Sequence, residues 1–80
     1  MDDKHRAKLE WRCRRGMREL DVLLMKYMER SFDGAEAAEQ AAFEKLLSLP
    51  DPEILDLLTE RTTAQDKSVQ HVVERLLSES

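Results

Sequence analysis

The 80-residue sequence lacks the residues from which most catalytic and metal centres are built. It has one cysteine, Cys13, which excludes an internal disulfide and suits a reducing compartment. Its two histidines, His5 and His71, stand alone and complete no metal-ligand spacing with the cysteine. There is no Gly-rich phosphate loop, no Ser/His/Asp set and no Cys/His pair at a workable spacing. The sequence therefore predicts no catalytic site, no metal and no cofactor that this chain holds stably.

Long apolar runs are also missing, and glycine and proline are scarce. No stretch approaches the roughly 20 apolar residues that span a bilayer, and the N-terminal residues lack the apolar core of a secretory signal. We therefore expect a mature chain in the cytoplasm. Two glycines, two prolines, 41% hydrophobic and 38% charged residues fit an all-helical protein. A chain this short buries only roughly 60% of its unfolded surface, which leaves little room for an enclosed pocket.

Apolar side chains recur at helical spacing in five segments of the chain. In the clearest, Leu20, Leu24 and Tyr27 step by four and three residues and mark one stripe of a helix. Residues 7–13 also alternate with the strand period of two, but the chain offers no partner strand, so a short helix is preferred. The sequence predicts an all-α fold, a compact five-helix bundle forming a single domain over residues 1–80, with helices at about 4–14, 17–30, 34–48, 52–61 and 66–78.

Helix starts and core positions follow from the same pattern. Asp33, followed three residues later by Glu36, resembles a capping box. Asp51 before Pro52 indicates the N-cap and first residue of the fourth helix. Isolated helices below ~12 to 15 residues are marginal in water, so a shared core must hold these together. We expect much of that core to consist of Leu20, Leu24, Phe43, Leu46, Leu55, Leu58, Val72 and Leu76.

Positive charge is concentrated in the first part of the chain. Residues 1–30 carry nine basic and six acidic side chains, a net of +3, whereas residues 31–80 carry four basic and eleven acidic ones, a net of −7. Residues 4–18 alone hold seven cations and one acid, which raises nucleic-acid binding as a hypothesis. The acidic remainder would repel phosphate, and no helix-turn-helix or aromatic stacking platform accompanies the arginines. We expect a protein partner, no nucleic acid and no membrane insertion.

The charges around Gly16 form the most distinctive stretch. Arg14, Arg15 and Arg18 flank this glycine, which leaves bare backbone beside guanidinium groups that bind carboxylates bidentately. Such a patch could dock closely on a partner. In the plainer alternative, Gly16 only caps the first helix in a left-handed conformation. Arg15 and Glu19, four residues apart, would then form an ordinary ion pair on a helix surface.

Two neighbours of this stretch have competing interpretations. Cys13 is interpreted as a small buried hydrophobe, because free cysteine is often buried. Trp11 fits equally well as an anchor of the first helix or as an interface residue.

The stretch from Trp11 to Asp21 resembles the small bacterial assembly factors that promote covalent flavinylation of succinate dehydrogenase. Its Arg15-Gly16-x-x-Glu19 run matches the RGxxE signature of that family. The resemblance implies a five-helix bundle that binds the flavoprotein subunit of succinate dehydrogenase, and in some bacteria that of fumarate reductase, while FAD becomes attached to that subunit.

The resemblance also implies which residues act. Carried over by position, Arg15, Gly16 and Glu19 would contact the partner, with Arg14 and Asp21 as neighbours. The chain would be a non-catalytic assembly factor or chaperone. FAD would belong to the partner, where its bond to a histidine forms autocatalytically. The alternative hypothesis is an antitoxin-like or regulatory module that binds a toxin or nucleic acid through the basic N-terminal segment.

Overall fold

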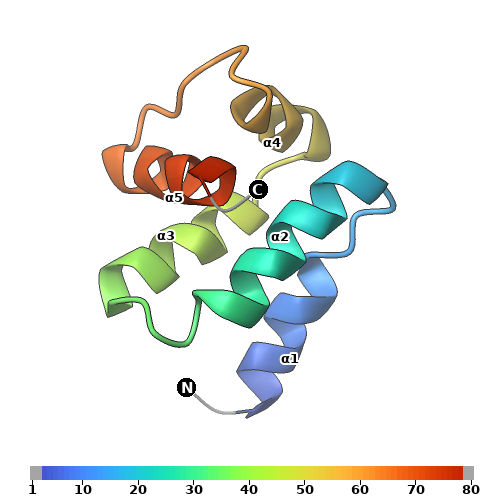
Figure 1. The fold of residues 1–80 in the computed structure, drawn as a ribbon, viewed down its shortest axis with the longest axis vertical. Coiled ribbons are helices and arrows are strands. Elements are labelled where there is room, and N and C mark those ends of the chain that lie inside the picture. Colours follow the sequence, from blue (N-terminus) through green and yellow to red (C-terminus); the bar gives the residue numbers. More distant parts are fainter. Residues whose placement is uncertain (1–2, 79–80) are drawn as a thin grey trace.

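The computed structural model describes residues 3–78 and contains five helices joined by short connections (Figure 1). The helices are α1 (Asp3–Arg12), α2 (Arg18–Arg30), α3 (Ala37–Leu47), α4 (Asp51–Leu58) and α5 (Lys67–Ser78). No strand occurs among the described residues. The all-α, five-helix fold that the sequence predicts is therefore confirmed.

The middle of the molecule is the packing of α3 on α5, which is the most extensive contact between any two helices. Figure 1 shows α3 and α5 side by side, and α2 and α4 both contact α5. The helix α1 lies at the outer side of the bundle and contacts α3. The connection from α1 to α2 therefore lies at the periphery of the core, and the connection from α3 to α4, Ser48 to Pro50, is also exposed or only partly buried.

Most of the buried core follows the predicted apolar stripes. The side chains that are buried are Leu9, Cys13, Leu20, Leu24, Tyr27, Met28, Phe32, Ala42, Phe43, Leu46, Leu47, Ile54, Leu57, Leu58, Val69, Val72, Val73 and Leu76. Leu55 was expected among them but is only half-buried. Ile54 and Leu58 define the inward face of the short helix α4, and each step along a helix turns by about 100°. Leu55 therefore lies at the edge of that face.

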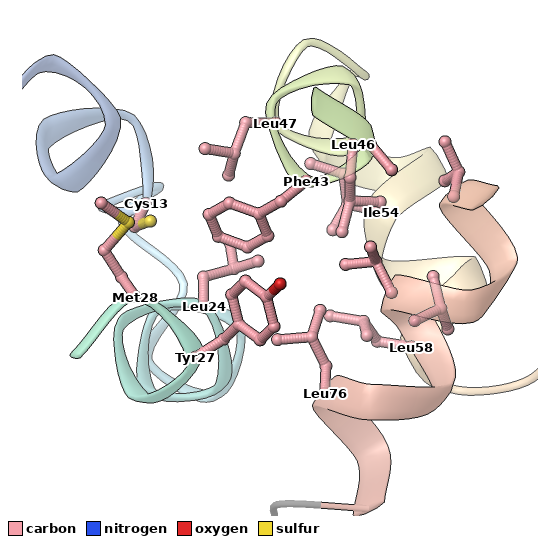
Figure 2. Close-up of a cluster of buried hydrophobic side chains, with 14 of the residues drawn as sticks. Cys13, Leu24, Tyr27, Met28, Phe43, Leu46, Leu47, Ile54, Leu58 and Leu76 are labelled. Carbon is pink, nitrogen blue, oxygen red and sulfur yellow. The ribbon is translucent and has the colours of Figure 1, made fainter. Parts of the chain in front are cut away.

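Three aromatic rings form the largest apolar group in the core. Tyr27 and Phe43 lie with ring centroids 4.5 Å apart, and Phe32 is 5.7 Å from Phe43. Figure 2 shows the first two rings facing each other between α2 and α3. The Tyr27 hydroxyl donates a hydrogen bond of 2.6 Å to Glu39, whose other oxygen lies 3.1 Å from His71 Nε2. The buried phenol is thus connected to the surface, as buried hydroxyls require a partner.

The start of α3 differs from the predicted capping box. Its N-cap is Glu36, which makes no side-chain capping hydrogen bond. Asp33 instead accepts a hydrogen bond of 3.1 Å from Arg6 Nε, which reaches across from α1. Phe32 is fully buried in the turn before α3, and its carbonyl accepts from Gln40 Nε2 at 2.7 Å. Because burial of Phe32 fixes this turn, Asp33 is directed toward α1 and away from the helix start.

The start of α4 is also displaced from the prediction. Pro50 is the N-cap and makes no side-chain cap, whereas Asp51 is the first residue of the helix. The Asp51 carboxylate faces Arg15 in the α1–α2 connection. The predicted N-cap role of Asp51 is therefore wrong, because a distant cation competes for its side chain.

Candidate partner-binding site

The connection between α1 and α2 consists of residues 13–17 and begins with a buried cysteine. The Cys13 side chain is fully buried, and in Figure 2 it lies beside Met28 at one side of the core. Burial raises the pKa of its thiol from 9.0 to about 12. The interpretation of Cys13 as a small buried hydrophobe is confirmed, and the protonated thiol is a poor nucleophile.

Gly16 turns the chain from the connection into α2. Its φ is +78°, the left-handed region that glycine adopts without a steric penalty. It does not cap α1 directly, because α1 ends at Arg12 and the N-cap of α2 is Met17. A Cβ atom built on Gly16 would meet nothing within 4 Å. The backbone at this position is thus open to an approaching molecule.

Arg15 points into the molecule, in contrast to the exposed fork expected from the sequence. Its Nη2 donates a hydrogen bond to the carbonyl of Leu47, the last residue of α3. Its Nη1 lies 3.4 Å from an oxygen of Asp51, and the side chain is only 19% exposed. No ion pair joins Arg15 to Glu19 among the described residues, because Arg15 precedes α2 and the two do not share a helix. The predicted helix-surface pair is therefore wrong.

Asp21 supports the connection from the first turn of α2. One of its carboxylate oxygens accepts a hydrogen bond of 2.7 Å from the backbone N–H of Arg15. The backbone N–H of Asp21 itself donates to the carbonyl of Met17 at 2.8 Å, which closes the first turn of the helix. Asp21 therefore links the residue before Gly16 to the helix after it.

The remaining predicted site residues are exposed. Arg14, Gly16 and Glu19 face solvent, and within residues 3–78 neither charged side chain has an ion pair or hydrogen bond that neutralises it. Trp11 is 73% and Val22 57% exposed, the two large hydrophobic side chains that protrude. Trp11 thus does not anchor α1, whose inward residues are Leu9 and Cys13. We call the exposed residues of this stretch the junction surface, which comprises Trp11, Arg14, Gly16, Arg18, Glu19 and Val22.

Two further features bear on chemistry. Within the described part of the chain, no group of three or more His, Cys, Asp or Glu side chains is arranged to hold a metal ion. None of the helices there has the length and apolar character needed to cross a membrane. The junction surface is accordingly the arrangement with the clearest capacity to bind, through guanidinium groups, a carboxylate and an open backbone.

Comparison with known proteins agrees with these features. A family model described as flavinator of succinate dehydrogenase matches residues 7–80. The FAD assembly factor SdhE of Haemophilus ducreyi is 37% identical over 76 residues, which cover 95% of this chain and 93% of that protein. The proteins of the same name from Yersinia pestis and a Serratia strain are 35% and 33% identical, over 98% and 91% of this chain and 89% and 83% of their own.

The fold and the junction surface define a small all-α protein with an exposed, charged turn between its first two helices. Within that class, the matched region extends from α1 to the end of the chain and includes the Arg15-Gly16-x-x-Glu19 run. The chain belongs to the family of flavinators of succinate dehydrogenase.

Proposed function

We propose that this chain is an assembly factor that binds the flavoprotein subunit of succinate dehydrogenase and promotes covalent attachment of FAD to it. The family membership supports the role, and the exposed charges of the junction surface support protein binding. The chain holds no FAD stably and performs no catalysis; the cofactor belongs to the partner. The corresponding subunit of fumarate reductase is a second candidate partner. The cytoplasmic location stays a prediction.

The junction surface is suited to docking because its charges are free to change partners. Arg14 and Glu19 are exposed, and none of the described residues neutralises them. Binding therefore requires no internal ion pair to break, which would cost free energy. A guanidinium group can take a carboxylate of the partner bidentately, and Glu19 can accept from a cation or backbone N–H. Gly16, between them in the chain, allows the two backbones to approach closely.

The basic N-terminal segment is less positive as folded than its sequence suggests. Arg6 is paired with Glu10 and Asp33, and Arg15 with Asp51. This neutralisation weakens the electrostatic attraction to phosphate on which nucleic-acid binding depends. The comparisons likewise give no support to a toxin-binding or nucleic-acid-binding module.

The proposal is tested by deleting the gene and measuring protein-bound flavin by gel fluorescence. The flavoprotein subunits of succinate dehydrogenase and fumarate reductase are tagged separately, so that each band is assigned. We expect fluorescence of the succinate dehydrogenase subunit to fall and to return when this chain is supplied from a plasmid. Equal amounts of subunit, checked by immunoblot, exclude altered expression. Undiminished fluorescence of both bands in the deletion strain would refute the function.

A further inference from the structure

The Arg15 side chain connects three parts of the molecule. It leaves the α1–α2 connection and ends between the last residue of α3, Leu47, and the first residue of α4, Asp51. Its Nε atom is buried and has no hydrogen-bond partner among the described residues. A guanidinium group in this position has little freedom to turn outward, because it would lose its hydrogen bond to the Leu47 carbonyl and its ion pair with Asp51.

The partners of Arg15 are electrostatically matched to it. Leu47 is at the C-terminal end of α3, where backbone carbonyls lack partners within the helix and the dipole attracts a cation. Asp51 is at the N-terminal end of α4, where an anion is favoured. Arg15 thus donates a hydrogen bond to a free carbonyl at the end of α3 and balances the negative charge of the carboxylate at the start of α4. These contacts hold the guanidinium against the α3–α4 corner.

The backbone of Arg15 is held as well. Its N–H donates to the Asp21 carboxylate at 2.7 Å, so the residue is fixed from α2 on one side and from the α3–α4 corner on the other. Gly16 follows immediately, has a φ of +78° and no atom within 4 Å of a built Cβ. Because glycine restricts its own conformation least of all residues, the position of the junction surface depends on how its neighbours are held.

We propose that Arg15 is a positioning residue, held by Asp51 and Asp21, which orders Gly16 and Glu19 for docking while its own guanidinium stays turned away from the partner. This inference rests on the proposed function, because one of its two tests measures binding to the flavoprotein subunit. It adds Asp51, more than thirty residues away in the sequence, to the residues on which docking depends. It also separates Arg15, whose partners lie inside the chain, from Arg14, which is exposed.

The first test uses Asp51→Ala with Glu53→Ala as its control. Glu53 is an exposed acid in the same first turn of α4, so the control removes the same charge near the same helix end. Hydrogen exchange of the Arg15 amide is followed by NMR in the free protein. We expect at least about a tenfold acceleration in Asp51→Ala, the factor that corresponds to losing one modest interaction, and none in Glu53→Ala. Equal exchange rates in both variants would overturn the inference.

The second test measures the affinity for the purified flavoprotein subunit that lacks covalent flavin. Arg15→Ala, Asp51→Ala and the double variant form a cycle, and we expect each single change to weaken binding about tenfold and the double change no more than that, as coupled residues show. If Arg15 contacts the partner directly, Arg15→Ala weakens binding far more than Asp51→Ala and the two effects add. That result would also overturn the inference.

Circular dichroism and thermal unfolding of each variant show whether it folds. If Arg15→Ala loses helix, Asp51→Asn replaces Asp51→Ala and Arg15→Lys replaces Arg15→Ala, since each keeps the side chain's approximate size. The same non-additivity is expected, and additive losses would count against the inference. The exchange experiment needs no partner, so it tests whether Asp51 holds Arg15 in place even if the flavoprotein proves not to bind, and a failure of the proposed function is thereby distinguished from a failure of the inference.

Discussion

The α1–α2 junction and the α3–α5 interface use charge in opposite ways. Across the α3–α5 interface, acidic and basic side chains are paired: Glu39 lies 3.1 Å from His71, and Lys45 donates to Asp66 at 2.6 Å. At the junction, only Arg15 is paired in this way. The exposed charges of the junction surface have no counterpart within the described residues.

This difference separates residues that stabilise the fold from residues that remain free to bind. Asp66 illustrates the first group, because it also accepts from the backbone N–H groups of Ser68 and Val69 at the start of α5. The bonds from Lys45 and Ser68 lower the pKa of its carboxyl group. Glu19 illustrates the second group, since it is in the first turn of α2 and exposed. A carboxylate at a helix start can thus have all its hydrogen bonds within the chain, as in Asp66, or remain available to a partner, as in Glu19.

The largest effect is expected from a change in the buried core. Phe43→Ala removes a fully buried ring that contacts Tyr27 and Phe32, and such changes cost about 3 to 5 kcal/mol. Trp11→Ala removes a ring that is 73% exposed and should change stability by less than about 0.5 kcal/mol. Urea unfolding followed by circular dichroism measures both. Similar losses in the two variants would contradict the division between core and junction.

The role of the junction surface is tested by measuring flavinylation in variants that keep the fold. We expect Gly16→Arg to abolish rescue of flavinylation, because a long side chain would occupy the open space above the backbone. Gly16→Ala is the matched control, since it imposes the same left-handed strain of about 1 to 2 kcal/mol without that bulk. Gel fluorescence of the flavoprotein measures rescue. Equal loss in both variants would show that backbone strain, and not access, is what matters.

Glu19→Ala belongs to the same experiment and should also abolish rescue. Glu29→Ala removes an exposed acid from the last turn of α2 and serves as its control. Circular dichroism of both variants should stay helical, because neither carboxylate supports the fold. A loss of helix in Glu19→Ala would favour a structural role for that residue.

The sequence allowed the helices and most of the core to be predicted, because the 3.6-residue period is a local property. Leu20 and Leu24 are buried as expected. Phe32 escaped prediction because it lies in a turn, where no period marks a residue as buried. Leu55 was predicted wrongly because a helix as short as α4 gives the period little length over which to fix its inward face.

The residues of the candidate site could be predicted from the sequence, but the directions of their side chains could not. A left-handed conformation of Gly16 was expected from a glycine at the end of the first predicted helix, and it is observed. The inward turn of Arg15 depends on a carbonyl 32 residues further along the chain, and that proximity exists only after α3 and α4 have packed. Capping by Asp33 and Asp51 failed for the same reason, since distant arginines compete for both carboxylates. Partner contact by the residues that the family resemblance implies, Arg14, Arg15, Gly16, Glu19 and Asp21, stays a prediction.

The last expected effect is absent at neutral pH and concerns the buried thiol of Cys13 at the start of the α1–α2 connection. Burial raises the pKa of Cys13 from 9.0 to about 12, so the unfolded chain loses the thiol proton first as the pH rises. The stabilisation from the neutral thiol is fully present below about pH 9 and is lost as the pH rises from 9.0 to about 12. We expect the urea midpoint to fall more steeply over that range in the wild type than in Cys13→Ala. Parallel profiles would show that the thiol does not titrate as described.

The exposed Trp11 makes the intrinsic fluorescence of the protein sensitive to the surroundings of the junction surface. It is the only tryptophan in the chain, and the residue is 73% exposed at the end of α1. Its emission therefore reports the polarity around the junction surface. Loss of the core, in which Tyr27, Phe32 and Phe43 are buried, changes the surroundings of this indole little. Fluorescence of the unlabelled protein can thus follow docking at the junction separately from unfolding of the bundle.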